Sequence, residues 1–232
     1  MNIALIGHGA MGRLIERLAG EKGHTITAVI DESGSASTPA ELAEQLRGAD
    51  VAIDFTTVDA VRRNVEASMI AGIPLVEGTT GWNNERDAIE KLVVESNGAF
   101  VFGANFSIGV NLFYRVTDFA AGLFSKFSDY EVFIEEQHHS RKKDAPSGTA
   151  LKLKEVVGRH VDDDFSVTAT RAGNIPGTHR VGFDGPADQI LLEHAARSRE
   201  GFASGALMAA EWIVGKKGFY EFTDVMDEIV HK

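Results

Sequence analysis

The N-terminal stretch Asn2-Ile3-Ala4-Leu5-Ile6-Gly7-His8-Gly9-Ala10-Met11-Gly12 decides the fold. A short apolar run ends in a G-x-G-x-x-G turn, and apolar residues at helical spacing follow over residues 10–19. In this context Gly7 permits a tight turn, Gly9 a close approach to a pyrophosphate, and Gly12 close packing of helix on strand. The stretch predicts a dinucleotide-binding strand, turn and helix, with an ordinary glycine turn as the alternative.

Strand and helix signals alternate through the first hundred residues. Besides residues 2–6, the runs that predict strands are 25–30, 51–55, 73–77 and 99–102. Helices are expected over 58–70 and 83–96. A further helix should start at Thr38-Pro39-Ala40-Glu41, with Thr38 as its cap and Glu41 completing a capping box. This alternation predicts a Rossmann-type α/β domain with a parallel sheet and right-handed crossovers.

After Asn105 the pattern changes to α+β. We expect helices over 109–123 and from the Ser147-Gly148-Thr149 turn to about residue 159, and strands over 130–136, 165–171, 178–184 and 189–198. These strands predict an open, mixed and largely antiparallel sheet. Helices over 202–214 and 222–230 are expected to pack back on the first domain. The predicted domains are residues 1–107 with about 203–232, which bind dinucleotide, and about 108–202, for substrate and oligomerisation.

Polar and small residues follow three of the predicted parallel strands, at the edge where open α/β sheets bind ligands. Asp31 ends the second strand, where a carboxylate binds both adenosine ribose hydroxyls and repels a 2′-phosphate; Glu32 strengthens that repulsion. NADH is therefore favoured, with NADPH possible. Gly78-Thr79-Thr80-Gly81 and Gly103-Ala104-Asn105-Phe106-Ser107 follow the fourth and fifth strands. Their small residues, hydroxyls and exposed backbone suit the ribose and nicotinamide.

The segment from His138 to Thr149 combines two adjacent histidines and three cations with a Pro-Ser-Gly-Thr turn. Histidine titrates near neutral pH and can pass a proton to a reacting atom. Lysine and arginine bind carboxylates, and a helix start, capped by Ser147 or Thr149, favours anions. The segment predicts a proton donor beside a carboxylate clamp, with a solvated basic surface as the alternative.

Composition limits the function classes further. The chain has 232 residues, a net charge of −11, no cysteine and 44% hydrophobic residues, which suffices for a core. An acidic chain argues against nucleic acid as a partner. No apolar run approaches membrane-spanning length, and the N-terminus lacks the basic region of a signal peptide. We expect a cytoplasmic protein without a membrane span, a disulfide or a metal site.

Together these segments resemble the dihydrodipicolinate reductase family, also called 4-hydroxy-tetrahydrodipicolinate reductase, of bacterial lysine and diaminopimelate synthesis. The resemblance spans nearly the whole chain, and the segment His-His-x-x-Lys-x-Asp-Ala-Pro-Ser-Gly-Thr carries it most specifically. The other matching segments are Gly7–Gly12, Asp54-Phe55-Thr56, Gly78-Thr79-Thr80-Gly81, Asn105–Asn111, Arg171–His179 and Ser198–Ala203.

The resemblance implies reduction of a hydroxylated tetrahydropyridine dicarboxylate, with loss of water, by a two-domain homotetramer. It implies that His138 donates or accepts the proton and that Lys142 is the second catalytic group. The implied substrate-carboxylate residues are His139, Gly148 and Thr149. The implied dinucleotide contacts are Gly7, His8, Gly9, Ala10, Met11, Gly12, Asp31, Gly78, Thr79, Thr80, Gly103, Ala104, Asn105 and Phe106.

Two departures and two alternatives accompany this resemblance. Glu32 stands where some family members carry a basic residue that accepts the 2′-phosphate, which puts dual cofactor use in doubt. Lys143 adds a second lysine, so the role of Lys142 depends on motif register. One alternative is another two-domain NAD-dependent dehydrogenase of an amino-acid-like acid, such as aspartate. The other is a non-catalytic dinucleotide sensor, which gives the histidine segment no purpose.

Overall fold

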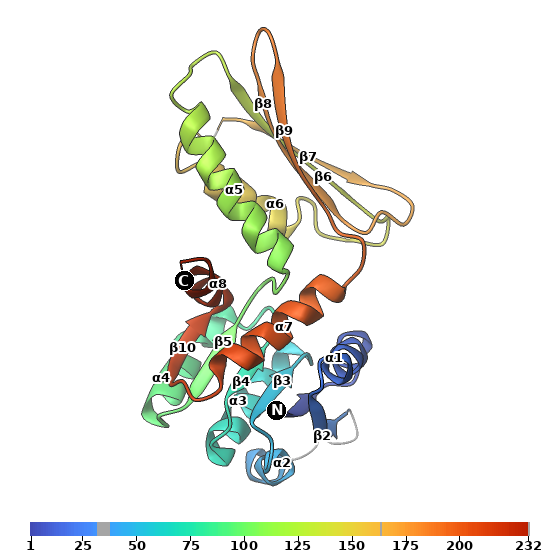
Figure 1. Cartoon of the computed structure of the whole chain (residues 1–232), viewed down its shortest axis with the longest axis vertical. Helices are drawn as coiled ribbons and strands as arrows, with labels where there is room; N and C mark the ends of the chain where they lie inside the picture. The colour runs from blue at the N-terminus through green and yellow to red at the C-terminus, as the bar shows by residue number, and fades with distance from the viewer. Residues whose placement is uncertain (32–37, 163, 232) are drawn as a thin grey trace. The chain divides into compact units, whose positions relative to one another are not determined.

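The computed structural model describes residues 1–31, 38–162 and 164–231, and the chain divides into two compact units. The first unit contains Met1–Ile108 and Glu200–Lys232, and the second contains Gly109–Arg199. Each unit is built around its own sheet (Figure 1). Glu32 lies outside the described residues, so its predicted effect on cofactor choice has no structural counterpart.

The first unit holds the expected Rossmann-type sheet, with strand order β10-β5-β4-β3-β1-β2 and parallel pairing throughout. The order reverses at β1, because β2 lies on one side of it and β3 on the other. Open parallel sheets bind ligands at the carboxyl ends of strands beside such a reversal. The strands are β1 (Asn2–Ile6), β2 (Thr25–Ile30), β3 (Val51–Asp54), β4 (Leu75–Glu77), β5 (Ala99–Phe102) and β10 (Gly218–Glu221).

Side-chain alternation along β1 shows why helices cover both faces of this sheet. Ile3 and Leu5 belong to one buried apolar cluster, whereas Ala4 and Ile6 belong to another. Successive side chains of a strand point to opposite faces, so each face carries its own apolar layer. The first cluster is covered by α1 (Ala10–Glu21), α7 (Glu200–Ile213) and α8 (Phe222–Val230). The second is covered by α2 (Pro39–Leu46), α3 (Val58–Ala71) and α4 (Arg86–Glu95), which follows the 3₁₀ turn η2 (Asn83–Glu85).

The predicted start of α2 is confirmed in detail. Thr38 is the N-cap residue, and its hydroxyl accepts a hydrogen bond from Glu41 N at 3.3 Å. The Glu41 carboxylate in turn accepts a hydrogen bond from Thr38 N at 2.8 Å, and Pro39 occupies the first turn. Both backbone donors at this helix end are thus satisfied locally, as a capping box requires.

The sixth strand, β10, is absent from the sequence prediction. Gly218–Glu221 pairs with Ala99–Phe102 of β5, and the ring of Phe219 stacks on Phe100 with centroids 5.2 Å apart. Four residues are too few to show a period, and the pairing partner lies more than a hundred residues away. The strand joins α7 to α8 and extends the sheet that both helices cover.

The second unit contains the expected open mixed sheet, in the order β7-β6-β8-β9. Its strands are β6 (Glu131–His138), β7 (Ser166–Arg171), β8 (Thr178–Asp184) and β9 (Gln189–Ala195). β6 pairs in parallel with β7 and antiparallel with β8, which is antiparallel to β9. The helices α5 (Ile108–Phe124) and α6 (Gly148–Val157) contribute side chains to the same apolar cluster as β6 and β8.

One boundary in the second unit differs from the sequence prediction and matters for function. The strand expected over 130–136 continues to His138, which is opposite Arg171 in the register with β7. His138 is therefore the last residue of a central strand rather than part of the following loop. Because side chains alternate along a strand, Ile134, Glu136 and His138 lie on the same face of the sheet.

Candidate active site

The glycine-rich turn after β1 depends on close backbone contacts within the first unit. Gly7 has a φ of +91°, and a Cβ on it would lie 2.3 Å from the carbonyl oxygen of Phe55. A Cβ on Gly12 would lie 2.1 Å from the carbonyl oxygen of Gly7. Gly9, the N-cap residue of α1, has open space around it. The turn thus packs tightly against the protein at two glycines and leaves room beside the third, which is the room that a pyrophosphate requires.

The remaining residues of this turn differ in their surroundings. His8 Nε2 lies 2.7 Å from Glu16 Oε2, so its ring is tied to α1. Ala10 is exposed, and Met11 is half-buried against the core beneath α1. Asp31 follows β2 directly, at the carboxyl end of the strand next to β1, and is exposed. These positions bring Asp31 and the glycine-rich turn to the same edge of the sheet.

The loops after β3 and β4 are joined by a threonine predicted to contact the dinucleotide. Thr79 Oγ1 accepts a hydrogen bond from Thr56 N at 3.0 Å, and Thr79 O accepts one from Trp82 Nε1 at 2.8 Å. Gly78 must be glycine because a Cβ there would lie 2.2 Å from the ring of Phe55. Thr80 is exposed. The hydroxyl of Thr79 therefore fixes the loop, which leaves the neighbouring backbone and Thr80 as candidate contacts.

The loop after β5 is held in a similar way. Asn105 Oδ1 accepts a hydrogen bond from Ser107 N at 2.8 Å, while Gly103 packs beneath the ring of Phe106. Phe106 itself is buried, with its ring 4.7 Å from that of Phe222. Ala104 is exposed. The side chain of Phe106 therefore belongs to the core, and the part of this loop open to a ligand is its backbone and Ala104.

A buried pair of carboxyl groups, which the sequence analysis missed, lies at the same edge of the sheet. Asp54 ends β3 and Glu77 ends β4, and both are fully buried. Asp54 Oδ2 accepts a hydrogen bond from Asn64 at 2.6 Å, and Glu77 Oε1 accepts one from Thr79 N at 2.7 Å. Burial, followed by the charge of Asp54 and a hydrogen bond to it, raises the pKa of Glu77 well above its ordinary value. A proton on Glu77, donated to Asp54, satisfies the remaining oxygen of each group.

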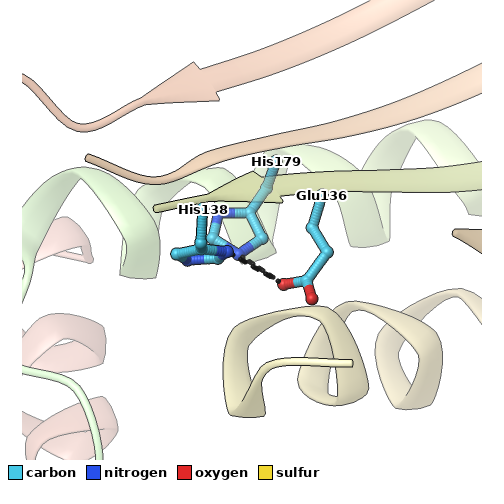
Figure 2. A group of neighbouring side chains, drawn as sticks. All are labelled: Glu136, His138 and His179. Carbon is cyan, nitrogen blue, oxygen red and sulfur yellow. Dashed lines mark ion pairs between the residues drawn. The ribbon is translucent and has the colours of Figure 1, made fainter. Parts of the chain in front are cut away.

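In the second unit, His138 lies in a compact buried cluster with Glu136 and His179 (Figure 2). Glu136 Oε2 is 3.4 Å from His138 Nδ1 and 3.5 Å from His179 Nε2. The two imidazole rings meet edge to face with centroids 5.1 Å apart. The sequence identified His138 but not its two partners. The period of two along β6 is the signal that could have identified Glu136, whereas His179 comes from β8 through strand pairing.

The other oxygen of Glu136 is held by two donors. Ser147 N donates to Glu136 Oε1 at 2.9 Å, and Arg171 Nη2 donates at 2.6 Å. Burial alone would raise the pKa of Glu136, but hydrogen bonds from the Ser147 hydroxyl, from Arg171 and from the Ser147 backbone outweigh it and hold the pKa below its ordinary value. Glu136 is therefore an ionised carboxylate, neutralised on one side by Arg171 and open on the other toward the two histidines.

Burial lowers the pKa of both histidines. For His138, burial is the main cause; Lys142 and Arg171 lower the pKa further, while Glu136 and Asp144 raise it. For His179, burial and then the neighbouring His138 bring the pKa to about 4. Both rings are consequently neutral near pH 7, and His138 has the stronger tendency to take up a proton.

Two of the three substrate-binding residues that the resemblance implies, Gly148 and Thr149, lie at the start of α6. Ser147, not Thr149, is the N-cap residue, and its hydroxyl accepts from Ala150 N at 3.2 Å. Gly148 is exposed with open space around it, and Thr149 lies in the first helical turn, hydrogen-bonded to Tyr114. His139 is half-buried and directly follows His138. The structure thus brings His138 and the N-terminus of α6 together through Glu136.

The cations of this segment have different partners. Lys142 is half-buried, and its Nζ lies 2.8 Å from Asp144 Oδ1. Arg141 donates a hydrogen bond to Asn174 Oδ1 at 3.0 Å, whereas Lys143 is exposed. The pKa effect on His138 also comes from Lys142. Of the two lysines, Lys142 is therefore the one whose charge acts on His138.

Comparisons with known proteins match both halves of the chain. The family model "Dihydrodipicolinate reductase, N-terminus" matches residues 1–106, and "Dihydrodipicolinate reductase, C-terminus" matches residues 109–226. A 4-hydroxy-tetrahydrodipicolinate reductase from Christiangramia forsetii is 36% identical over 241 residues, with 99% of each chain covered. One from Staphylococcus epidermidis is 37% identical over 247 residues, covering 97% of this chain and 100% of the relative.

Solved structures share the fold. A dihydrodipicolinate reductase from Paenisporosarcina sp. TG-14, solved with dipicolinate bound, has a TM-score of 0.80 at 22% identity, covering 97% of this chain and 99% of its own. A probable dehydrogenase from Thermotoga maritima has a TM-score of 0.59 at 9% identity, covering 99% and 94%. Both solved structures thus share the fold across nearly the whole chain at low sequence identity.

The buried Asp54–Glu77 pair makes stability depend on pH. Because the pKa of Glu77 is raised by folding, its contribution is complete below its ordinary value of 4.5 and is lost as pH rises through the folded pKa. Glu77→Gln keeps both hydrogen bonds without this loss. We expect the variant to gain stability over the native chain as pH rises, by up to about 1.4 kcal/mol per pH unit. Urea unfolding at about pH 5 and about pH 8 measures the difference.

The exposed Glu90 of α4 provides the matched control. Glu90→Gln should follow the native protein at both pH values. A stability difference between Glu77→Gln and the native chain that stays constant with pH would show that Glu77 is ionised in the fold.

Proposed function

Because this chain belongs to the dihydrodipicolinate reductase family, we propose that it reduces 4-hydroxy-tetrahydrodipicolinate to tetrahydrodipicolinate, with loss of water. The enzyme is an NAD(P)H-dependent oxidoreductase of lysine and diaminopimelate synthesis. The observation that carries the proposal is the His138 cluster, a buried titratable imidazole beside Lys142 in a chain of net charge −11. A dicarboxylate substrate needs such a local cationic site, and its reduction needs a proton.

The carboxyl edge of the first-unit sheet fits a nicotinamide dinucleotide. Gly9 leaves open space at the N-terminus of α1, where backbone N–H groups favour a pyrophosphate. When bound, the reduced nicotinamide supplies the hydride. The carboxylate of Asp31, at the end of β2, supports a preference for NADH, because it accepts hydrogen bonds from ribose hydroxyls and repels a 2′-phosphate.

The second unit would hold the substrate carboxylates. The N-terminus of α6 offers the backbone N–H groups of Gly148 and Thr149, and no side chain blocks the approach at Gly148. Lys142 would exchange its ion pair with Asp144 for a substrate carboxylate. Dipicolinate, the compound bound in the Paenisporosarcina structure, is itself a planar dicarboxylate, which supports this substrate class.

His138 would supply the proton that accompanies hydride transfer. Its ring is neutral near pH 7 without ligand, mainly because of burial. Two substrate carboxylates add negative charge nearby, and an opposite charge favours the protonated imidazole. The dicarboxylate would thus raise the pKa of its own proton donor. In the balanced reaction, one hydride and one proton add to the substrate and one water leaves.

We further propose a cytoplasmic homotetramer that assembles through the second unit. No helix in the described part of the chain is long and apolar enough to span a membrane. Exposed apolar side chains lie on α5 and β9 of the second unit, among them Val116, Phe119 and Leu191. Apolar side chains of this size are commonly covered by contacts between subunits.

The second prediction concerns activity and cofactor choice. Condensing pyruvate with aspartate semialdehyde provides the substrate, and the oxidation of NADH and of NADPH is then followed separately. We expect turnover with both cofactors and a higher kcat/KM with NADH, because of the Asp31 carboxylate. Oxidation only with an amino-acid-like acid would favour the other dehydrogenase class, and cofactor binding without turnover would favour a sensor. An equal or higher kcat/KM with NADPH would contradict the role of Asp31.

The third prediction separates the roles of the histidine and the lysines. His138→Gln should lower kcat by about 100-fold or more, because it removes the proton donor. Lys142→Ala should lower kcat and raise KM together, because it removes a substrate contact and a charge that acts on His138. Lys143→Ala, its exposed neighbour, should leave both constants close to those of the native enzyme. Unchanged turnover of His138→Gln would remove His138 from the mechanism.

A further inference from the structure

We propose that Glu136 is a positioning residue for His138: its free oxygen fixes the ring with the proton on Nδ1 and presents Nε2 to the substrate. This inference rests on the proposed function, because it assigns the geometry of the same proton donor. Nothing in the sequence motif distinguishes Glu136 from the half-buried Glu135 before it. The structure does so through four contacts, which join β6 to β7, β8 and α6.

The carboxylate of Glu136 is immobilised before it meets the histidine. Its side chain is completely buried, and Oε1 accepts hydrogen bonds from Ser147 N at 2.9 Å and Arg171 Nη2 at 2.6 Å. Arg171 is itself anchored by the carbonyl oxygen of Asp144. With Oε1 saturated, Oε2 remains without a hydrogen bond and is directed at His138 Nδ1 (Figure 2).

The distance and chemistry of this contact specify the ring tautomer. His138 Nδ1 lies 3.4 Å from Glu136 Oε2 and is buried without another partner. An ionised carboxylate can only accept, so the favourable arrangement places the proton on Nδ1. Proton uptake and release then take place at Nε2. A carboxylate that holds a catalytic imidazole in one tautomer is the arrangement of serine-protease triads.

Gly177 keeps the other nitrogen uncovered. It precedes β8 with a φ of +135°, and a Cβ at this position would lie 3.2 Å from His138 Nε2. Any side chain here would both strain the backbone and cover the nitrogen that exchanges the proton. Glu136 and Gly177 thus act on opposite sides of the imidazole ring, one orienting it and the other leaving it accessible.

Charge also distinguishes Glu136 from its surroundings. The titratable and charged groups that face His138 are Glu136 on β6, Arg171 on β7, His179 on β8, and Lys142 and Asp144 in the following loop. Lys142 and Arg171 oppose protonation of the ring, whereas the two acids favour it. Asp144 is exposed and already paired with Lys142. Glu136 is therefore the buried acid that favours the protonated form of the His138 ring.

The same three residues, Glu136, His138 and His179, also form the donor set of a divalent transition-metal site, with ligand atoms within 4.8 Å of one another. Two contacts favour a proton over a metal ion. Arg171 places a permanent positive charge 2.6 Å from the carboxylate, and a cation bound to the other oxygen would be repelled by it. His179 Nε2 already lies 3.2 Å from Ser147 Oγ. The cluster is therefore better suited to hold a hydrogen atom between Glu136 and His138.

The test uses protein labelled with ¹⁵N-histidine and needs no substrate, so its outcome is independent of the proposed reaction. In the native chain we expect the ¹⁵N shifts of neutral His138 to report protonated Nδ1 and unprotonated Nε2. In Glu136→Gln, the amide oxygen replaces Oε1 toward Ser147 and Arg171, and the amide NH₂ faces His138. The tautomer should then invert, and the pH at which His138 takes up a proton should fall. Glu135→Gln, on the opposite face of β6 and paired with Arg180, is the matched control and should change neither.

The same variants are also assayed for activity, with the substrate made by condensing pyruvate with aspartate semialdehyde. Glu136→Gln should lower kcat by about 100-fold with little change in KM, and its pH profile should shift in the direction of the His138 pKa. A purely structural role would change KM and stability without changing the tautomer. Protonated Nε2 in the neutral native ring, or stoichiometric Zn²⁺ binding that Glu136→Gln abolishes, would overturn the proposal. Native Nδ1 protonation without reductase activity would overturn the proposed function and leave the tautomer assignment standing.

Discussion

The buried carboxylate of Glu136 is the interaction on which the second unit depends. An isolated ion in a protein interior costs several kcal/mol, so it persists only where charge and hydrogen bonds compensate it. Here the compensation comes from Arg171 on β7 and from the backbone of Ser147 at the start of α6. Satisfying this one anion therefore fixes the parallel pairing of β6 with β7 and the docking of α6. It also places the imidazole of His138 at the end of the strand.

A comparison of the two buried acid sites shows how environment determines protonation. Glu136 meets an arginine and a backbone donor, and its pKa falls although it is buried. Glu77 meets another carboxyl group, Asp54, and its pKa rises. The first arrangement gives a fixed negative charge that can polarise a histidine. The second gives a pair that shares one proton and so carries one negative charge instead of two, at the point where the loops after β3 and β4 are joined. Two buried glutamates thus have opposite pKa shifts because their neighbours differ.

The sequence predicted the features that depend on local periodicity. Alternating strand and helix signals predicted the parallel sheet, and Thr38 and Glu41 predicted a helix start that the structure reproduces. Features that arise from pairing between distant segments were not predictable in this way. β10 is a four-residue strand next to β5, and His179 reaches the cluster only because β8 lies beside β6. Glu136 was only partly predictable from the sequence, since it shares a strand face with His138 but lies outside the recognisable motif.

The excess of acidic residues makes the local cations more informative than their number suggests. In a chain of net charge −11, the positive groups near His138 are each held by an acid: Arg171 by Glu136, and Lys142 by Asp144. In the first pair the Glu136 side chain is fully buried, and its Oε1 accepts hydrogen bonds from both Arg171 and Ser147 N. This pair is therefore structural. The second is partly open to solvent, and a surface ion pair contributes little to stability. Under the proposed function, a dicarboxylate replaces Asp144 at small energetic cost, while the Arg171–Glu136 pair remains intact. The proposal thus assigns substrate binding and ring orientation to different ion pairs, so that the charge of the site changes while its geometry is kept.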